Sequence, residues 1–354
     1  MPKKPKSKWI VAIAVVIALL ALPVAAQATL VYTHAPLNPS VYAANDNGSG
    51  AHKIDKGTQP DVSPDGNTVA YFHEGPGHAQ ELMVAATDGS GSPRQLLAAW
   101  RESFVFAWSA DSTRVAALTG PELGKRRLVV IDVATGKQQT IASGYFWGVS
   151  FSPQGNEQLV YAQAGADRYP PHSDIYRIDL LPIGAVGVAA PSLRRLTSDH
   201  RSTSPLWGPN GKIVFVKQLG AKQRKYGPKN DLFLMNESGG QVKRLTNTKV
   251  DPLLTGLSPT QWSANGNRLL TEFGGQDTSY AVTVNPKTGA ERALTKEREI
   301  GFVGAALSAD GKTVLGSIGE FEGNIPDRKV LTIPYAGGKP KVLVKNASEP
   351  DWSR

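Results

Sequence analysis

Short apolar segments alternate with polar turns along the chain, and one turn motif recurs six times. Each copy has a large apolar residue, then Ser or Gly, Pro or Ala, a polar residue and usually Gly. The apolar residues that open the copies are Val62, Trp108, Phe151, Trp207, Trp262 and Leu307. Successive copies lie 46, 43, 56, 55 and 45 residues apart, and Asp351-Trp352-Ser353 begins a further copy after another 45. Periods of this size are typical of four-stranded propeller blades.

The motif predicts a tight turn between two antiparallel strands. Pro presets the backbone for the first turn position, Asp or Asn tolerates the second, and Gly takes the left-handed conformation. A second apolar strand follows the turn, as at 68–72, and a third follows a loop, as at 174–179. A fourth strand ends in Arg-Leu-Thr, as at 195–197 and 244–246. We interpret the tryptophans that close the first strand as packing residues: they are Trp108, Trp207, Trp262 and Trp352.

Counting the repeats predicts seven blades. Six complete units run from about residue 57 to 345, which leaves a single first strand at 349–353. Residues 29–56 supply three more strands, at 30–34, 40–44 and 50–54. We therefore expect an all-β protein, a seven-bladed β-propeller of four-stranded blades over residues 29–354. Pairing of the N- and C-terminal strands in one split blade is expected to close it, which would remove open sheet edges.

Three segments of the repeat resemble the propeller repeats of the TolB family. They are Xaa-Pro-Asp-aromatic-Ser-Pro-Asp-Gly, found at 59–66 with Val62 at the aromatic place, Asp-Ile-Tyr at 174–176, and Arg-Leu-Thr. The resemblance covers nearly all of residues 29–354 and implies a TolB-like fold, but no particular activity. This region leaves no length for the small α/β domain that precedes the propeller in the periplasmic TolB protein. We therefore do not expect that protein's role in its translocation assembly.

The first 28 residues have the pattern of a secretory signal peptide. Lysines without any acid precede the apolar run 9–22, and Pro23 is followed by the small-residue site Ala26-Gln27-Ala28. This order predicts cleavage after Ala28. The alternative is an uncleaved anchor within 9–28, since the 19 residues of 10–28 are close to the ~20 that a bilayer needs. In either case we expect the propeller outside the cytoplasmic membrane: secreted, periplasmic or in the cell envelope.

Composition excludes several classes of function. The chain has 39 Lys and Arg against 30 Asp and Glu, and without the four lysines of residues 1–28 the balance is 35 against 30, or +5. So small an excess on an exported body does not favour nucleic acid as a partner. The chain has no Cys, which excludes disulfides, thiolate metal sites and cysteine catalysis. No G-x-S-x-G, H-E-x-x-H, P-loop or EF-hand pattern occurs. We therefore expect a binding module without a cofactor rather than an enzyme.

The loop at 217–229 is the leading candidate for a partner-binding surface. Within 13 positions it holds five basic residues and no acid: Lys217, Lys222, Arg224, Lys225 and Lys229. Arg168 lies in a long loop of the neighbouring repeat, and long loops in compact repeats are often functional. A positive surface attracts anionic partners. We expect a monomer that binds an envelope protein, an anionic polymer or lipid headgroups; the alternative is a solvated charged loop.

Five of the six histidines fall in or beside loops on one predicted face of the propeller. Some seven-bladed relatives of this repeat class are pectate-fragment lyases, which hold a metal with clustered histidines. The resemblance therefore implies an alternative function, a metal-dependent lyase of acidic oligosaccharides that uses His73, His78 and His172, with Glu74 beside them. No His-x-His pair occurs. The competing interpretation is that these are polar loop residues with no shared site.

Overall fold

The computed structural model describes residues 28–35, 37–75, 79–98, 106–120, 126–165, 172–184, 192–220, 228–251, 253–275, 278–295, 301–319 and 328–354. These residues are almost entirely β-structure, and helical structure among them is limited to the 3₁₀ turn η3 (Pro209–Gly211). Within the described ranges, no helix is long and apolar enough to cross a membrane. The expected signal peptide or anchor lies outside these ranges except for Ala28.

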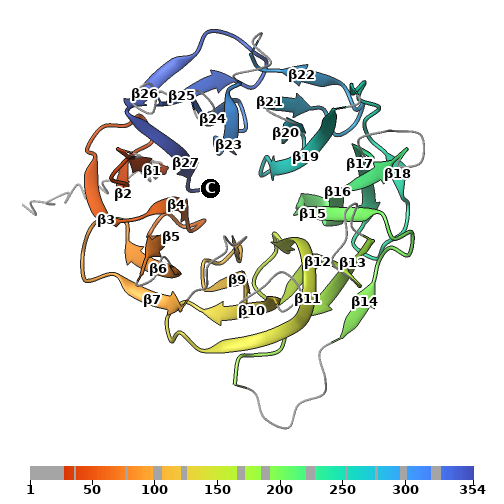
Figure 1. The fold of residues 1–354 in the computed structure, drawn as a ribbon, viewed down its shortest axis with the longest axis horizontal. Helices are drawn as coiled ribbons and strands as arrows, with labels where there is room; N and C mark the ends of the chain where they lie inside the picture. The colour runs from red at the N-terminus through yellow and green to blue at the C-terminus, as the bar shows by residue number, and fades with distance from the viewer. Residues whose placement is uncertain are drawn as a thin grey trace, which may run out of the picture.

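The strands form sheets that are arranged in a ring (Figure 1). Three sheets have four strands each. In spatial order, the first contains β27 (Ala347–Trp352), β1 (Thr29–His34), β2 (Ser40–Asn45) and β3 (His52–Lys56). The second contains β4 (Thr58–Val62), β5 (Thr68–Glu74), β6 (Gln80–Ala86) and β7 (Arg94–Leu97). The third contains β23 (Val303–Leu307), β24 (Thr313–Ile318), β25 (Lys329–Pro334) and β26 (Lys341–Lys345).

Two larger sheets complete the described strands. The first contains β8 (Phe106–Trp108), β9 (Arg114–Thr119), β10 (Arg126–Asp132), β11 (Gln138–Phe151), β12 (Gln158–Ala164), β13 (Ser173–Asp179) and β14 (Leu193–Arg195). The second contains β15 (Ser202–Gly208), β16 (Lys212–Leu219), β17 (Lys229–Asn236), β18 (Lys243–Arg244), β19 (Leu254–Trp262), β20 (Leu269–Gly275), β21 (Thr278–Val284) and β22 (Glu291–Ala293). Each consists of two successive antiparallel meanders. The first half of β11 pairs with β10 and its second half with β12, whereas β17 meets β19 through a parallel bridge between Asn230 and Gly256.

The two ends of the described chain lie in one sheet. β1 pairs antiparallel with β27, which places Leu30 opposite Trp352 and His34 opposite Ala347. The backbone N–H of Thr29 donates to Ser353 Oγ at 2.9 Å. Figure 1 shows the C-terminus near the middle of the ring, beside β4. The first and last strands of the described chain are therefore joined directly.

The recurrent turn is stabilised by its own aspartate. Ser63 Oγ donates to Asp65 Oδ1 at 2.6 Å, and the same carboxylate oxygen accepts from the Asn67 backbone N–H at 3.1 Å. Equivalent bonds link Ser109 to Asp111 and Ser308 to Asp310. The repeated aspartates therefore hold the backbone and serine of their own turns.

One turn lacks the glycine. Ser112 replaces it and still takes the left-handed conformation, with φ of 63°. A side chain costs energy at this φ. The Ser112 hydroxyl accepts a hydrogen bond from the Asp65 backbone N–H of the preceding turn at 3.1 Å. The position therefore links two neighbouring turns, a contact that glycine could not make.

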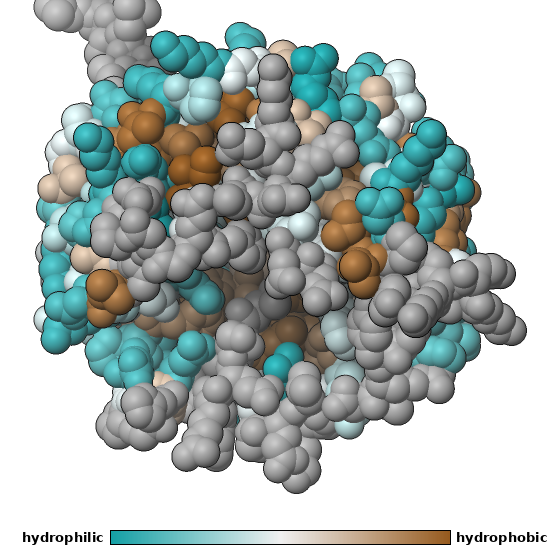
Figure 2. All heavy atoms as spheres, turned by 45° about the horizontal axis from the view of Figure 1, so that its top comes forward, coloured by the Kyte–Doolittle hydropathy of each residue, from teal (hydrophilic) through white to brown (hydrophobic). Residues whose placement is uncertain are grey.

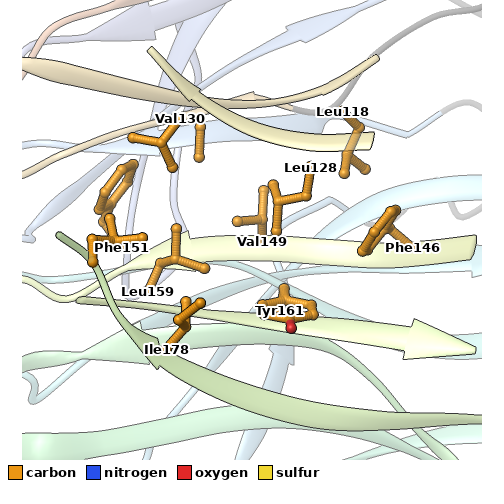
Figure 3. Packing of buried hydrophobic residues seen from close by; sticks show 11 residues of the cluster. Leu118, Leu128, Val130, Phe146, Val149, Phe151, Leu159, Tyr161 and Ile178 are labelled. Carbon is orange, nitrogen blue, oxygen red and sulfur yellow. The ribbon is translucent and has the colours of Figure 1, made fainter. Parts of the chain in front are cut away.

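Apolar side chains fill the space between neighbouring meanders. Figure 3 shows one such cluster, in which Leu118 and Leu128 from β9 and β10 pack with Phe146, Val149 and Tyr161 from β11 and β12. The four tryptophans of the motif pack in the same kind of place. Trp207, Trp262 and Trp352 are buried, and Trp108 is half-buried. Packing between meanders therefore complements the hydrogen bonds within each sheet.

Hydrogen bonds also join the inner strands, which are the first strands of the meanders and lie nearest the middle of the ring (Figure 1). The residue before each motif tryptophan, or its substitute, makes these bonds in two ways. Its side chain accepts the next inner strand's backbone N–H in three pairs: Asp351 with Val62, Ser150 with Trp207, and Gln261 with Leu307. Its carbonyl accepts an indole N–H in two pairs: Asp61 with Trp108, and Leu206 with Trp262. The motif tryptophan thus has a polar role as well as a packing role.

Candidate functional site

One side of the ring carries the turns that lead from the second to the third strand of each meander, together with the starts of the inner strands. In the second sheet, Thr58 at the start of β4 lies opposite Phe72, and Glu74 at the end of β5 lies opposite Gln80. We call this side the loop face. Two cavities are lined by residues of the loop face. The described histidine and lysine candidates, His73, His172, Lys217 and Lys229, also belong to it.

The larger cavity, about 730 Å³, lies between the first and second sheets. We call it the polar cavity. Its lining residues are Asn38, Pro39, Lys56, Gly57, Thr58, Phe72, His73, Glu74, Gly75 and Gln80. His73 Nδ1 and Gln80 Oε1 are buried and make no hydrogen bond. Glu81 Oε2 lies 3.5 Å from His73 Nδ1, a charge contact without hydrogen-bond geometry. This cavity therefore presents buried polar atoms without hydrogen bonds, which native proteins rarely leave.

The smaller cavity, about 520 Å³, lies where β11 bends toward the middle of the ring. We call it the aromatic cavity. Its lining residues are Leu118, Arg126, Tyr145, Phe146, Trp147, Gly148, Val149, Ser204, Pro205, Leu206, Pro259 and Thr260. Gly148, with φ of 107°, allows the bend, because a Cβ there would lie 3.0 Å from Ser204 Cα. Trp147 Nε1 is buried without a hydrogen bond. Aromatic and proline side chains around a few polar groups are typical of ligand sites.

The basic loop is only partly described. Lys222, Arg224, Lys225 and Arg168 lie outside the described residues. Lys217 Nζ lies 2.6 Å from Asp199 Oδ2, and Lys229 Nζ lies 3.2 Å from Asp231 Oδ2. Two of the five lysine and arginine charges predicted to face a partner are therefore paired within the chain. Lys217 on β16 lies opposite Ser202 of β15, two residues before Ser204, which lines the aromatic cavity.

The histidine candidates do not share one described site. His73 ends β5 at the polar cavity, whereas His172 precedes β13 in another sheet and stacks on His200 with ring centroids 6.3 Å apart. His78 lies outside the described residues. Among the residues that the structure describes, no group of three or more His, Asp or Glu side chains could hold a metal ion. Figure 2 shows a mostly hydrophilic surface with small hydrophobic groups.

Two motifs of the sequence meet in an ion pair whose carboxylate is buried and whose guanidinium is exposed. Asp174, which begins Asp-Ile-Tyr, lies 2.5 Å from the Arg195 guanidinium of Arg-Leu-Thr, and Thr197 Oγ1 donates to Asp174 Oδ1 at 3.1 Å. His200 Nδ1 also lies 2.9 Å from Asp174 Oδ2. The next meander repeats the arrangement with Asp231 and Arg244. The recurring spacing of these motifs was the signal for this contact, which sequence reasoning left unused.

A second pair of acids lies where the chain ends meet. The side chains of Asp61 on β4 and Asp351 on β27 are hydrogen-bonded to each other. Burial, reinforced by the neighbouring Asp351 carboxyl, raises the pKa of Asp61 well above its usual range, against the opposing charge of Arg354. Burial also raises the pKa of Asp351, again opposed by Arg354. Like charges this close favour a shared proton.

Comparison with known proteins identifies the fold. No protein-family model and no curated protein matches the chain. TolB from Acinetobacter baumannii is similar with TM-score 0.56 and 17% identity, covering 89% of this chain and 79% of that one. The β-propeller domain of the Trilobed protease from Pyrococcus furiosus is similar with TM-score 0.64 and 15% identity, covering 90% of this chain and 92% of that one. Oligogalacturonate lyase from Vibrio parahaemolyticus is similar with TM-score 0.54 and 14% identity, covering 89% of this chain and 79% of that one. The chain therefore has the TolB-like β-propeller fold that its motifs predicted, and at these identities the similarity shows the fold alone.

Proposed function

We propose that this chain is an exported, seven-bladed TolB-like propeller that binds an envelope partner and catalyses no reaction. The blade count is supported by the six motif copies and the further one that begins at Asp351. It is also supported by the division of the large sheets into meanders at β11 and at the Asn230–Gly256 bridge. Export is supported by the signal-peptide pattern of residues 1–28. The partner is an envelope protein or an anionic polymer, and the propeller acts as a monomer.

The observation that carries this proposal is the aromatic cavity. It gathers Tyr145, Trp147 and two prolines from three inner strands, and the buried Trp147 Nε1 has no acceptor. Tyr and Trp in partly enclosed places dominate the binding energy of protein interfaces. An apolar side chain of the partner fills this cavity in our proposal, and one of its carbonyl groups accepts from Trp147.

The basic loop contributes attraction at longer range. Lys217 and Lys229 are paired with aspartates, so the proposed field comes from Lys222, Arg224, Lys225 and Arg168. Such a field raises association rates with an acidic partner and weakens with salt. The aromatic cavity would then set how long the complex lasts, because apolar anchors act mainly on dissociation.

The test is capture of crosslinked envelope proteins by the purified chain and by two variants. Trp147→Ala should lose the bands that the unaltered protein captures. Leu193→Ala, which removes an exposed apolar side chain on β14, should retain them. Thermal melting of both variants shows whether a loss reflects unfolding. Equal capture by both folded variants would remove the aromatic cavity from the proposal.

A metal-dependent lyase of acidic oligosaccharides is the second candidate function. His73 and Glu74 both line the polar cavity, which is the observation in its favour. The separation of His73 from His172 in different sheets counts against one shared centre. Metal analysis of the purified protein, with an assay for unsaturated sugar products, separates the two functions. Bound metal together with cleavage that His73→Ala abolishes would replace the binding module by the lyase.

A further inference from the structure

The polar cavity has walls from two sheets that approach each other closely at Gly57. The backbone N–H of Gly57, between β3 and β4, donates to Pro39 O at 3.2 Å and so extends the β2–β3 pairing beyond Ser40 and Lys56. Gly57 has φ of +153°, and a Cβ there would lie 2.5 Å from Phe72 O. Only glycine lets the two walls approach this closely. The volume of about 730 Å³ falls within the range of small-molecule sites.

Two buried polar atoms in this cavity lack hydrogen bonds. Gln80 Oε1 can only accept a hydrogen bond, and His73 Nδ1 can donate or accept according to its tautomer. Both are buried, and neither makes a hydrogen bond. Burying such groups unpaired is unfavourable. A ligand that offers donors to Gln80 and a polar group to His73 would relieve both.

The charges on the two walls differ in sign. Lys56, at the end of β3, lines one wall and is exposed. Glu74, at the end of β5, lines the other wall, and Glu81 follows Gln80 behind it. A neutral sugar would satisfy the hydrogen bonds but would leave this separation of charge unused. A ligand with a cationic and an anionic end matches both walls.

We propose that the polar cavity binds a zwitterion of the amino-acid type, of up to dipeptide size. Its ammonium donates to Gln80 Oε1 and lies on the Glu74 side, and its carboxylate faces Lys56. The inference is independent of the proposed partner site, because none of the residues that line the aromatic cavity lines this one.

The test is calorimetric titration of the purified protein with alanyl-alanine. N-acetyl-alanyl-alanine lacks the ammonium and alanyl-alanine amide lacks the carboxylate, so both should bind at least tenfold more weakly than the dipeptide. Maltose, a neutral disaccharide, should not bind. If maltose binds and alanyl-alanine does not, the assignment by charge is overturned.

Two variants locate the binding. Gln80→Leu removes the acceptor, and Lys56→Gln removes an exposed cation with little risk to folding. Each should weaken alanyl-alanine binding at least tenfold, whereas Lys341→Gln, a change at an exposed lysine on β26, should leave it unchanged. Unaltered binding in Lys56→Gln and in folded Gln80→Leu would overturn the proposal, as would the absence of any binding to the unaltered protein. Neither result would alter the Trp147 test of the partner site.

Discussion

The junction between the chain ends and the junction between β11 and β15 use the same position of the repeat with different chemistry. At the chain ends, Asp351 Oδ2 accepts the Val62 backbone N–H at 3.0 Å. Between β11 and β15, Ser150 Oγ accepts the Trp207 backbone N–H at 3.1 Å. The serine bond is neutral at every physiological pH. The aspartate bond involves a carboxyl that shares its surroundings with Asp61, so the strength of the junction at the chain ends depends on protonation.

Packing at the chain-end junction should give the largest effect. Trp352→Ala removes a buried indole from a cluster with Leu30 and Tyr32 of β1, and we expect a loss of about 3–5 kcal/mol of unfolding free energy. Trp108→Ala removes a half-buried indole and should cost less. Urea denaturation of the two variants measures both losses. Equal losses would show that the chain ends pack no more critically than an internal junction.

Removing the hydrogen bond between Ser150 and the Trp207 backbone should have the next largest effect on the free energy of unfolding. Ser150→Ala leaves the Trp207 backbone N–H without its acceptor in a buried place, which should cost about 1–3 kcal/mol. Ser143→Ala changes an exposed serine on the same strand and should stay within about 0.5 kcal/mol. Chemical denaturation of the pair isolates the hydrogen bond from the loss of a hydroxyl.

Protonation should distinguish the chain-end junction from all neutral ones. The folded pKa of Asp61 lies above its ordinary 3.8, so its contribution to stability is fully present below pH 3.8 and is lost as pH rises through the folded pKa. Asp61→Asn keeps a polar side chain without the charge. It should therefore stabilise the protein at pH 8, by on the order of 1 kcal/mol, and much less at pH 4.

A control with the opposite sign is available in the turns. Hydrogen bonds from Lys312 and Ser308 lower the pKa of Asp310 to about 2, so the stability it contributes is present at neutral pH and is lost as pH falls through the folded pKa. Asp310→Asn should therefore destabilise at pH 8. Between pH 5 and 8 the melting temperature of Asp310→Asn should lie below that of the unaltered protein by a constant amount, whereas that of Asp61→Asn should rise above it as the pH increases. A curve for Asp61→Asn that stays parallel to that of the unaltered protein would rule out the shared proton at the chain ends.

The smallest effect on stability is expected away from both junctions. Replacing Lys222, Arg224 and Lys225 together with Ser should change the unfolding free energy by no more than about 0.5 kcal/mol. At low salt the triple variant should bind the partner more weakly than the unaltered protein does, because the lost attraction is electrostatic. Binding measured in 20 mM and 500 mM salt checks this. Binding that survives both the triple substitution and high salt would mean that these residues form a solvated loop.

Local chemistry explains which parts of the fold could be predicted from the sequence. The turn motif carries its own hydrogen bonds, as Ser63 and Asp65 show, so strands beside it are placed well: the predicted 68–72 lies within β5 and 40–44 within β2. The strand predicted at 50–54 lies instead at His52–Lys56. The turn before it extends farther, because the Asn45 backbone N–H bonds to Ser49 O.

The candidate site was less predictable, because it depends on which meanders become neighbours. His73 and His172 do belong to the loop face, but nothing in their spacing tells that they end in different sheets. Lys217 pairs with Asp199, 18 positions away, and that contact exists only once β15 and β16 have paired. The aromatic cavity combines β11, β15 and β19. Ser-Pro precedes the motif tryptophan on both β15 and β19, but Tyr145 and Trp147 of β11 have no counterpart in those strands.

The contact between Thr29 and Ser353 joins residues 324 positions apart. A ribosome makes β1 first and β27 last. β1 can pair with β2 early, but its other partner, β27, exists only when almost the whole chain has been made. Contacts of such separation form late, because the entropy of loop closure must be overcome before they contribute. Until then the edge of β1 is open to strands of other molecules. A chaperone that covers Leu30 to His34 during this interval would protect the protein at its most exposed moment.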